Sequence, residues 1–93
     1  MDAIAKHLTL RGRVQGVCFR AWTVEVAGNL GLSGWVRNRA NGDVEVVVQG
    51  DRKAVERFVA LALEGPPAAR VDEVEVLDQA VSDLDGFRQR PTI

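Results

Sequence analysis

Residues 6–30, KHLTLRGRVQGVCFRAWTVEVAGNL, change their hydrophobic period near the middle. Up to residue 14 the apolar side chains alternate, with Leu8, Leu10 and Val14 on one face, as a strand with one buried face requires. From residue 19 onward the period is three to four residues. The positions on this predicted helix face are Phe19, Trp22, Thr23, Val26, Ala27 and Leu30. The segment therefore predicts a strand over residues 6–14 that leads directly into an amphipathic helix.

A hairpin is predicted after the first helix. Gly31 stands where a residue in the left-handed conformation commonly ends a helix. Residues 34–38 and 43–49 then flank Asn41-Gly42, a dipeptide suited to the positive φ angles of a tight hairpin turn. These segments are the second and third predicted strands.

A second helix and two further strands complete the predicted order. Asp51 is placed to act as the N-cap of a helix that ends at Gly65-Pro66-Pro67. The apolar face of this helix consists of Ala54, Val55, Phe58, Leu61 and Ala62. Residues 71–81 predict a fourth strand, and residues 86–90 predict a short edge strand before Pro91.

The predicted order is βαββαβ with an extra C-terminal edge strand, which is typical of the split βαβ, or ferredoxin-like, fold. Each helix has one apolar face, so we expect both helices on one face of an antiparallel sheet. The chain of 93 residues is shorter than the usual domain of about 100–150 residues. We therefore predict an α+β sandwich that forms a single domain over residues 1–93.

Composition restricts the classes of partner. Twelve Lys and Arg face thirteen Asp and Glu, so a net charge of -1 provides no overall attraction for nucleic acid or an anionic membrane. Cys18 is the only cysteine and His7 the only histidine, which excludes an intramolecular disulfide and leaves no ligand set for zinc. The sequence has neither a secretory signal pattern nor an apolar run of the ~18 residues that a membrane span needs. We expect a cytoplasmic protein with no nucleic-acid partner, no membrane partner and no metal.

The junction between the first strand and the first helix is the place where chemistry is expected. Residues 14–20 form a loop around Gly16 that leads into the start of a helix, where free backbone N–H groups and the helix dipole favour an anion. Arg20 adds a guanidinium whose fork of donors matches two phosphate oxygens. The alternative is an ordinary turn with a solvated arginine. The spacing does not fit the phosphate loop of nucleotide hydrolases, which needs a Lys followed by Ser or Thr.

Two motifs give the sequence a family resemblance. Residues 12–20, GRVQGVCFR, resemble the first signature of the acylphosphatases. Residues 34–38, GWVRN, followed by Asn41-Gly42 and Val44-Glu45, resemble the second, although Asn41 stands where an aspartate is common. The resemblance runs from about Leu8 to Phe87. It implies a cofactor-free hydrolase that cleaves the carboxyl-phosphate bond of acyl phosphates to a carboxylate and inorganic phosphate.

The resemblance also implies roles for particular residues. Arg20 and Asn38 are the expected catalytic residues: Arg20 holds the phosphoryl group and Asn38 positions the attacking water. The expected phosphate-binding residues are Gln15, Gly16, Val17, Cys18, Phe19 and Arg20. The substrate is a small-molecule acyl phosphate, inorganic phosphate or sulfate is a product-like ligand, and we expect a monomer.

Three other functions stay open at this stage. A ferredoxin-like module that binds RNA or a small anion is disfavoured by the net charge and by the few aromatic residues, three Phe, two Trp and no Tyr. Handling of carbamoyl phosphate is the role of acylphosphatase-like domains in larger hydrogenase-maturation proteins. A thiolate nucleophile at Cys18 is disfavoured because only Phe19 separates it from Arg20.

The remaining charged and aromatic residues have ordinary interpretations. His7 is expected as an exposed edge histidine, and the acidic side chains of residues 72–78 as a solvated strand. Trp22 and Trp35 are expected to pack in the core or on the sheet. Four arginines lie near the motifs and form either a positive rim that attracts anions or ion pairs on the sheet; they are Arg11, Arg13, Arg37 and Arg39.

Overall fold

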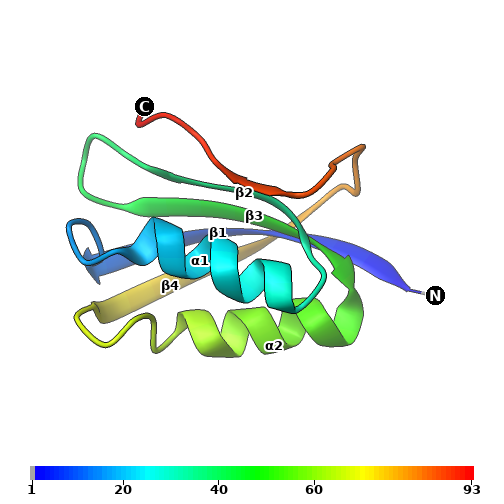
Figure 1. Ribbon diagram of the computed structural model, residues 1–93, viewed down its shortest axis with the longest axis horizontal. Helices are drawn as coiled ribbons and strands as arrows, with labels where there is room; N and C mark the ends of the chain where they lie inside the picture. Colours follow the sequence, from blue (N-terminus) through cyan, green and yellow to red (C-terminus); the bar gives the residue numbers. More distant parts are fainter. Residues whose placement is uncertain (1) are drawn as a thin grey trace.

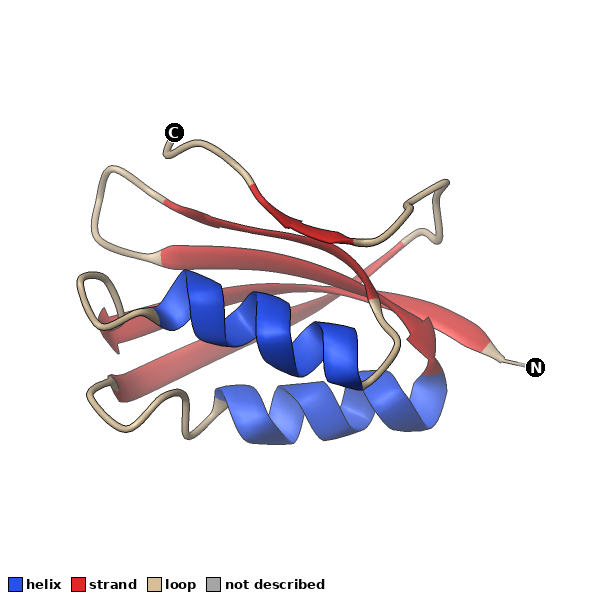
Figure 2. Ribbon diagram, in the orientation of Figure 1, coloured by secondary structure: helices blue, strands red, loops and turns tan. Residues whose placement is uncertain are grey.

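The computed structural model describes residues 2–93 as five strands and two helices (Figure 1). The elements in chain order are β1 (Ala3–Arg13), α1 (Phe19–Asn29), β2 (Ser33–Asn38), β3 (Val44–Asp51), α2 (Arg52–Ala62), β4 (Arg70–Gln79) and β5 (Phe87–Gln89). Both helices lie on the same face of the sheet, as Figure 2 shows. This arrangement confirms the predicted α+β, ferredoxin-like sandwich and its extra edge strand.

The sheet has the strand order β4-β1-β3-β2-β5. The pairs β1–β3, β1–β4 and β2–β3 are antiparallel, but β5 runs parallel to β2. The prediction of a wholly antiparallel sheet is therefore wrong for β5. The reason is the connection between β4 and β5. β4 ends at the end of the sheet where β2 begins, and residues 80–86 cross to the far edge at that same end. β5 therefore starts beside the start of β2 and runs in the same direction. The Gln49 side chain fastens this crossing by donating to Ser82 O at 2.7 Å and accepting from Ser82 N at 2.9 Å.

The core fills the space between the helices and the inner face of the sheet. Leu8, Val46 and Val36 point inward from the three central strands, and Phe58 of α2 packs among them, all with no exposed surface. Burial of each such side chain contributes about 1.5–3 kcal/mol. In α1 the buried face is Phe19, Thr23 and Ala27, and the Thr23 hydroxyl is satisfied because it donates to Phe19 O at 2.9 Å.

The helix ends follow the sequence signals. Gly31 has a φ of 71°, and the N–H groups of Gly31 and Leu32 donate to Gly28 O and Ala27 O, which is the Schellman arrangement. The Asp51 side chain accepts from Lys53 N at 3.1 Å and caps α2 as predicted. Neither of the described helices is long and apolar enough to cross a membrane.

The turn between β2 and β3 differs from the predicted two-residue type. Arg39 N donates to Asp43 O, so the loop consists of Ala40, Asn41 and Gly42. Gly42 has a φ of 100°, whereas Asn41 has no positive φ and instead accepts from Asp43 N through its side chain. A three-residue loop with one left-handed glycine is the next most favoured hairpin connection. The glycine is needed as predicted, but only one residue of the pair takes the left-handed conformation.

The outer face of the sheet carries a cluster of charges around Glu45, which is 8% exposed. His7 Nε2 lies 2.6 Å from Glu45 Oε2, and Arg37 and Arg39 donate to Glu45 Oε1 at 2.6 and 3.1 Å. Burial raises the pKa of Glu45, but these three hydrogen bonds outweigh it and lower the pKa from 4.5 to about 2. The prediction of an exposed edge histidine is wrong, because β1 lies between β4 and β3 and places His7 beside this carboxylate.

Candidate active site

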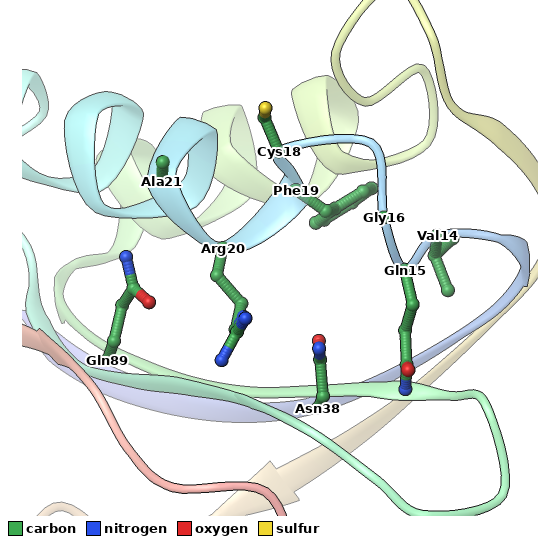
Figure 3. Close-up of a pocket in the computed structure, with 9 residues that line it drawn as sticks. All are labelled: Val14, Gln15, Gly16, Cys18, Phe19, Arg20, Ala21, Asn38 and Gln89. Atoms are coloured by element: carbon green, nitrogen blue, oxygen red, sulfur yellow. The ribbon is translucent and has the colours of Figure 1, made fainter.

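The β1–α1 loop and the β2–β3 hairpin lie at the same end of the sheet (Figure 1). A pocket of about 380 Å³ opens there (Figure 3). Its lining consists of Val14, Gln15, Gly16, Cys18, Phe19, Arg20, Ala21, Asn38 and Gln89. Both predicted catalytic residues and most of the predicted phosphate loop reach this one pocket. Val17 does not line the pocket; its side chain is 7% exposed and packs in the core.

The loop backbone is shaped by two residues in the left-handed conformation. Gly16 has a φ of 72° and Cys18 a φ of 62°, and Cys18 is the only non-glycine residue with positive φ in the described residues 2–93. Alternation of this kind turns successive N–H groups toward one side and forms a concave anion site. The side chains of Val17 and Phe19 are buried in the core and anchor the loop to it. At Gly16 a Cβ would meet nothing within 4 Å, so glycine is required there for its φ and not for space.

Arg20 brings its charge to the start of α1. The helix begins at Phe19, so Arg20 lies in its first turn, where the free N–H groups already form a positive end. Its side chain points from α1 toward Asn38 (Figure 3). Within residues 2–93 no carboxylate forms an ion pair with Arg20. Because no described carboxylate neutralises Arg20, its guanidinium and the N–H groups at the start of α1 favour an anion bound between them.

Other arginines near the motifs are neutralised by carboxylates. Arg11 lies 3.4 Å from Asp43 and 2.8 Å from Glu73, while Arg37 and Arg39 bind Glu45. Of the four arginines that were expected as a rim or as ion pairs, these three are therefore paired, and Arg13 is exposed. The acidic side chains of residues 72–78 are exposed, as expected for a solvated strand, and three of them form ion pairs: Asp72 with Arg70, Glu73 with Arg11 and Asp78 with Lys6.

Asn38 is the last residue of β2 and faces the helices, as Val36 does two residues earlier. Figure 3 shows its side chain pointing into the pocket toward Arg20. The alternative role, a bond to the adjacent turn, is filled by Asn41, whose side chain accepts from Asp43 N. Within residues 2–93 the Asn38 amide makes no side-chain hydrogen bond of the kind that ties Asn41 to its turn. It is free to bind a small polar group in the pocket.

Two glutamines complete the pocket in ways that sequence reasoning missed. Gln89 reaches the site from β5, where it lies opposite Val36, and its side chain points toward Arg20 (Figure 3). Gln15 was expected only through its backbone N–H, yet its side chain binds the β2–β3 hairpin. No local pattern signals either contact, because each joins segments that are distant in the sequence.

Cys18 is exposed, and its Sγ points away from Arg20 (Figure 3). A thiol in this direction cannot attack a phosphorus atom held by Arg20, which argues against the thiolate mechanism. The outer sheet face offers no open aromatic platform for RNA either, because the guanidinium groups of Arg37 and Arg90 lie 4.8 and 4.6 Å from the Trp35 ring centroid. Among residues 2–93 no group of three metal-ligating side chains is present.

The fold and the pocket define a class of protein. It is an α+β sandwich in which the loop before α1, Arg20 and Asn38 surround a pocket whose N–H groups and guanidinium suit a phosphoryl group. The family model for acylphosphatase matches residues 6–89. An acylphosphatase of Rhizorhabdus wittichii is 51% identical over 92 residues, which cover 99% of this chain and 93% of that protein. The chain therefore belongs to the acylphosphatase family, whose reaction is the hydrolysis of acyl phosphates.

Solved structures agree with this assignment. The structure of an acylphosphatase from Coxiella burnetii superimposes with a TM-score of 0.93 at 39% identity, covering 96% of this chain and 94% of that one. Full-length HypF, in its phosphate- and nucleotide-bound form, gives a TM-score of 0.90 at 28% identity. This chain is covered to 98% in that comparison but matches only 12% of HypF. The likeness to HypF is thus a likeness to one small part of a much larger protein.

Proposed function

We propose that this enzyme hydrolyses small-molecule acyl phosphates with the phosphoryl group held by Arg20 and the N–H groups of residues 15–20, and with the attacking water positioned by Asn38. One observation carries the proposal. Arg20 lies in α1, which follows β1, and Asn38 ends β2, which is not a neighbour of β1 in the sheet. Both side chains nevertheless point into the pocket, beside a loop with two left-handed residues. Inorganic phosphate and sulfate would occupy the same place as product-like ligands.

The chemistry needs little beyond these groups. Water attacks the phosphorus atom, the bond from phosphorus to the acyl oxygen breaks, and the carboxylate leaves with the bonding electron pair. The proton of the water passes to a phosphate oxygen. A carboxylate is a good leaving group, so the main requirements are an aligned water and charge stabilisation on the phosphoryl oxygens. Arg20 and the loop amides supply the charge stabilisation, and the Asn38 side-chain carbonyl accepts a hydrogen bond from the water.

A substrate panel tests this function. The purified enzyme is given acetyl phosphate, benzoyl phosphate and carbamoyl phosphate, beside p-nitrophenyl phosphate and a sugar phosphate. We expect turnover of the acyl phosphates and far slower turnover of the esters, because a phenolate or an alkoxide is a poorer leaving group than a carboxylate and the residues that line the pocket include no acid that could protonate it. Comparable rates on benzoyl phosphate and p-nitrophenyl phosphate would overturn the mechanism. A strong preference for carbamoyl phosphate would favour the alternative in which the domain handles carbamoyl phosphate.

Two accompanying proposals concern the state of the protein. A single free cysteine, exposed at Cys18, fits a reducing compartment and supports a cytoplasmic location. A monomer is the expected assembly, and sedimentation equilibrium of the purified chain tests it.

A further inference from the structure

The two halves of the site belong to strands that are not neighbours in the sheet. Arg20 and the phosphate loop follow β1, whereas Asn38 ends β2, and β3 lies between these strands. The last β1–β3 pair is Leu10 with Val44, and the last β2–β3 pair is Asn38 with Val44. Residues 14–18 lie beyond the end of this ladder, so no backbone hydrogen bond of the sheet fixes their distance from Asn38.

The Gln15 side chain spans this gap. Its Nε2 donates to Arg39 O at 2.7 Å and to Asp43 O at 2.8 Å. These carbonyl groups belong to the two residues that close the hairpin loop, since Arg39 N also donates to Asp43 O at 2.8 Å. Both N–H groups of the amide are used, and the first acceptor belongs to the residue that directly follows Asn38.

We infer that Gln15 is a positioning residue that sets the separation between the phosphate loop and Asn38. Its backbone belongs to the loop that holds the phosphoryl group, and its amide is bonded to the hairpin next to the residue that holds the water. In-line attack requires the water and the phosphorus atom to be aligned, and a misplacement of about 1 Å can cost about 10²-fold in rate. The inference rests on the proposed roles of the loop and Asn38, and it adds a function for a side chain whose amide is bonded to the hairpin.

The test uses Gln15→Met, which keeps the length and neutrality of the side chain but removes both donors. We expect kcat to fall by about 10- to 100-fold, while the Ki of inorganic phosphate changes by less than about threefold, because Arg20 and the loop amides remain. Gln49→Met is the matched control. Gln49 also fastens two segments through its amide, by two hydrogen bonds to Ser82, but at the opposite end of β3. It should lose a similar amount of stability with kcat and Ki unchanged.

A double-mutant cycle with Asn38→Ala separates positioning from general destabilisation. If Gln15 acts by placing the loop relative to Asn38, Gln15→Met should slow the Asn38→Ala enzyme by less than about threefold, since there is no longer a positioned water to misalign. Equal losses in both backgrounds would overturn the inference, as would a Gln15→Met enzyme with the kcat of Gln49→Met. An unmutated enzyme that hydrolyses no acyl phosphate is a different outcome, which removes the proposed function and the inference with it.

Discussion

In the proposed mechanism, Arg20 and Asn38 contact different parts of the reacting system. Arg20 would bind the phosphoryl oxygens both before and during the reaction, because its guanidinium points into the pocket from the start of α1. Asn38 would bind the water and has little to contribute to the binding of phosphate alone. The two residues should therefore affect kcat and phosphate affinity in different proportions.

Arg20→Ala is expected to lower kcat by at least the ~10²–10³-fold that is typical for removal of one preorganised donor. It should also raise the Ki of inorganic phosphate, because the same contact exists with the product. Arg20→Lys should recover only part of the rate, since the charge returns without the fork of donors. Steady-state kinetics with benzoyl phosphate, together with phosphate inhibition, measures both quantities. Full recovery in the lysine variant would show that charge alone is sufficient.

Asn38→Ala is expected to lower kcat by a similar or larger factor while phosphate still binds with nearly the original Ki. The reason is that the loop and Arg20 are unchanged, whereas the water loses its acceptor. Asn41→Ala is a suitable control, because Asn41 shapes the turn and does not line the pocket. An Asn38→Ala enzyme with unchanged kcat and reduced stability would assign Asn38 a purely structural role.

Cys18→Ser should keep most of the activity, because in the proposed site the residue acts through its backbone N–H, and its Sγ points away from Arg20 (Figure 3). Cys18→Gly is informative for a second reason. With a φ of 62°, Cys18 occupies a conformation that costs a non-glycine residue roughly 1–2 kcal/mol. Glycine removes this strain but adds freedom to the unfolded chain, so we expect little net change in the melting temperature. Complete loss of activity in a folded Cys18→Ser variant would revive the thiolate mechanism.

At the scale of elements, the pattern of hydrophobic residues predicts the positions of both helices and of strands β1 to β4. The Gly31 and Asp51 end signals also hold, because each acts on backbone groups within a few residues. The direction of β5 and the environment of His7 could not be predicted in the same way. Both depend on strand order, which brings distant segments together and is not encoded in any local period. The signature glycine Gly12 is also explained only by the fold, because its Cβ would lie 2.3 Å from Arg70 O of β4.

Glu45 of β3 binds His7 of β1, Arg37 of β2 and Arg39, which follows β2 and closes the hairpin loop. Its pKa falls from 4.5 to about 2, so the folded state binds fewer protons than the unfolded state in this range. The resulting stabilisation, about 3 kcal/mol, is present above pH 4.5 and is lost as the pH falls toward 2.

Glu45→Gln should therefore be less stable at pH 7 and should lose less stability on acidification than the unmutated enzyme. Urea unfolding between pH 7 and pH 3 measures both effects. Glu75→Gln is the control, because Glu75 is exposed on β4 and forms no ion pair among residues 2–93. An identical loss of stability with pH in the Glu45→Gln and unmutated enzymes would show that the cluster makes no pH-dependent contribution.

At the scale of the whole molecule, the site is assembled from residues that are far apart in the sequence. The two signatures identify Arg20, Asn38 and the loop, and the structure brings these into one pocket. The contributions of Gln89 and of the Gln15 side chain could not be foreseen, because they depend on where the far edge strand and the hairpin come to lie. A local motif can predict which groups do chemistry more readily than which groups hold them in place.

Because the proposed anion site would exist only in the folded chain, inorganic phosphate should stabilise the whole molecule by mass action. At ten times its Kd, phosphate adds about 1.4 kcal/mol, which raises the melting temperature of a domain of this size by roughly 6–11 °C. Sulfate should act similarly, while chloride at matched ionic strength should not. Differential scanning calorimetry of three proteins checks the origin of the shift. Asn38→Ala should keep it, because the loop and Arg20 are intact, whereas Arg20→Ala should lose most of it. Equal shifts in all three proteins would place the bound phosphate away from the proposed site.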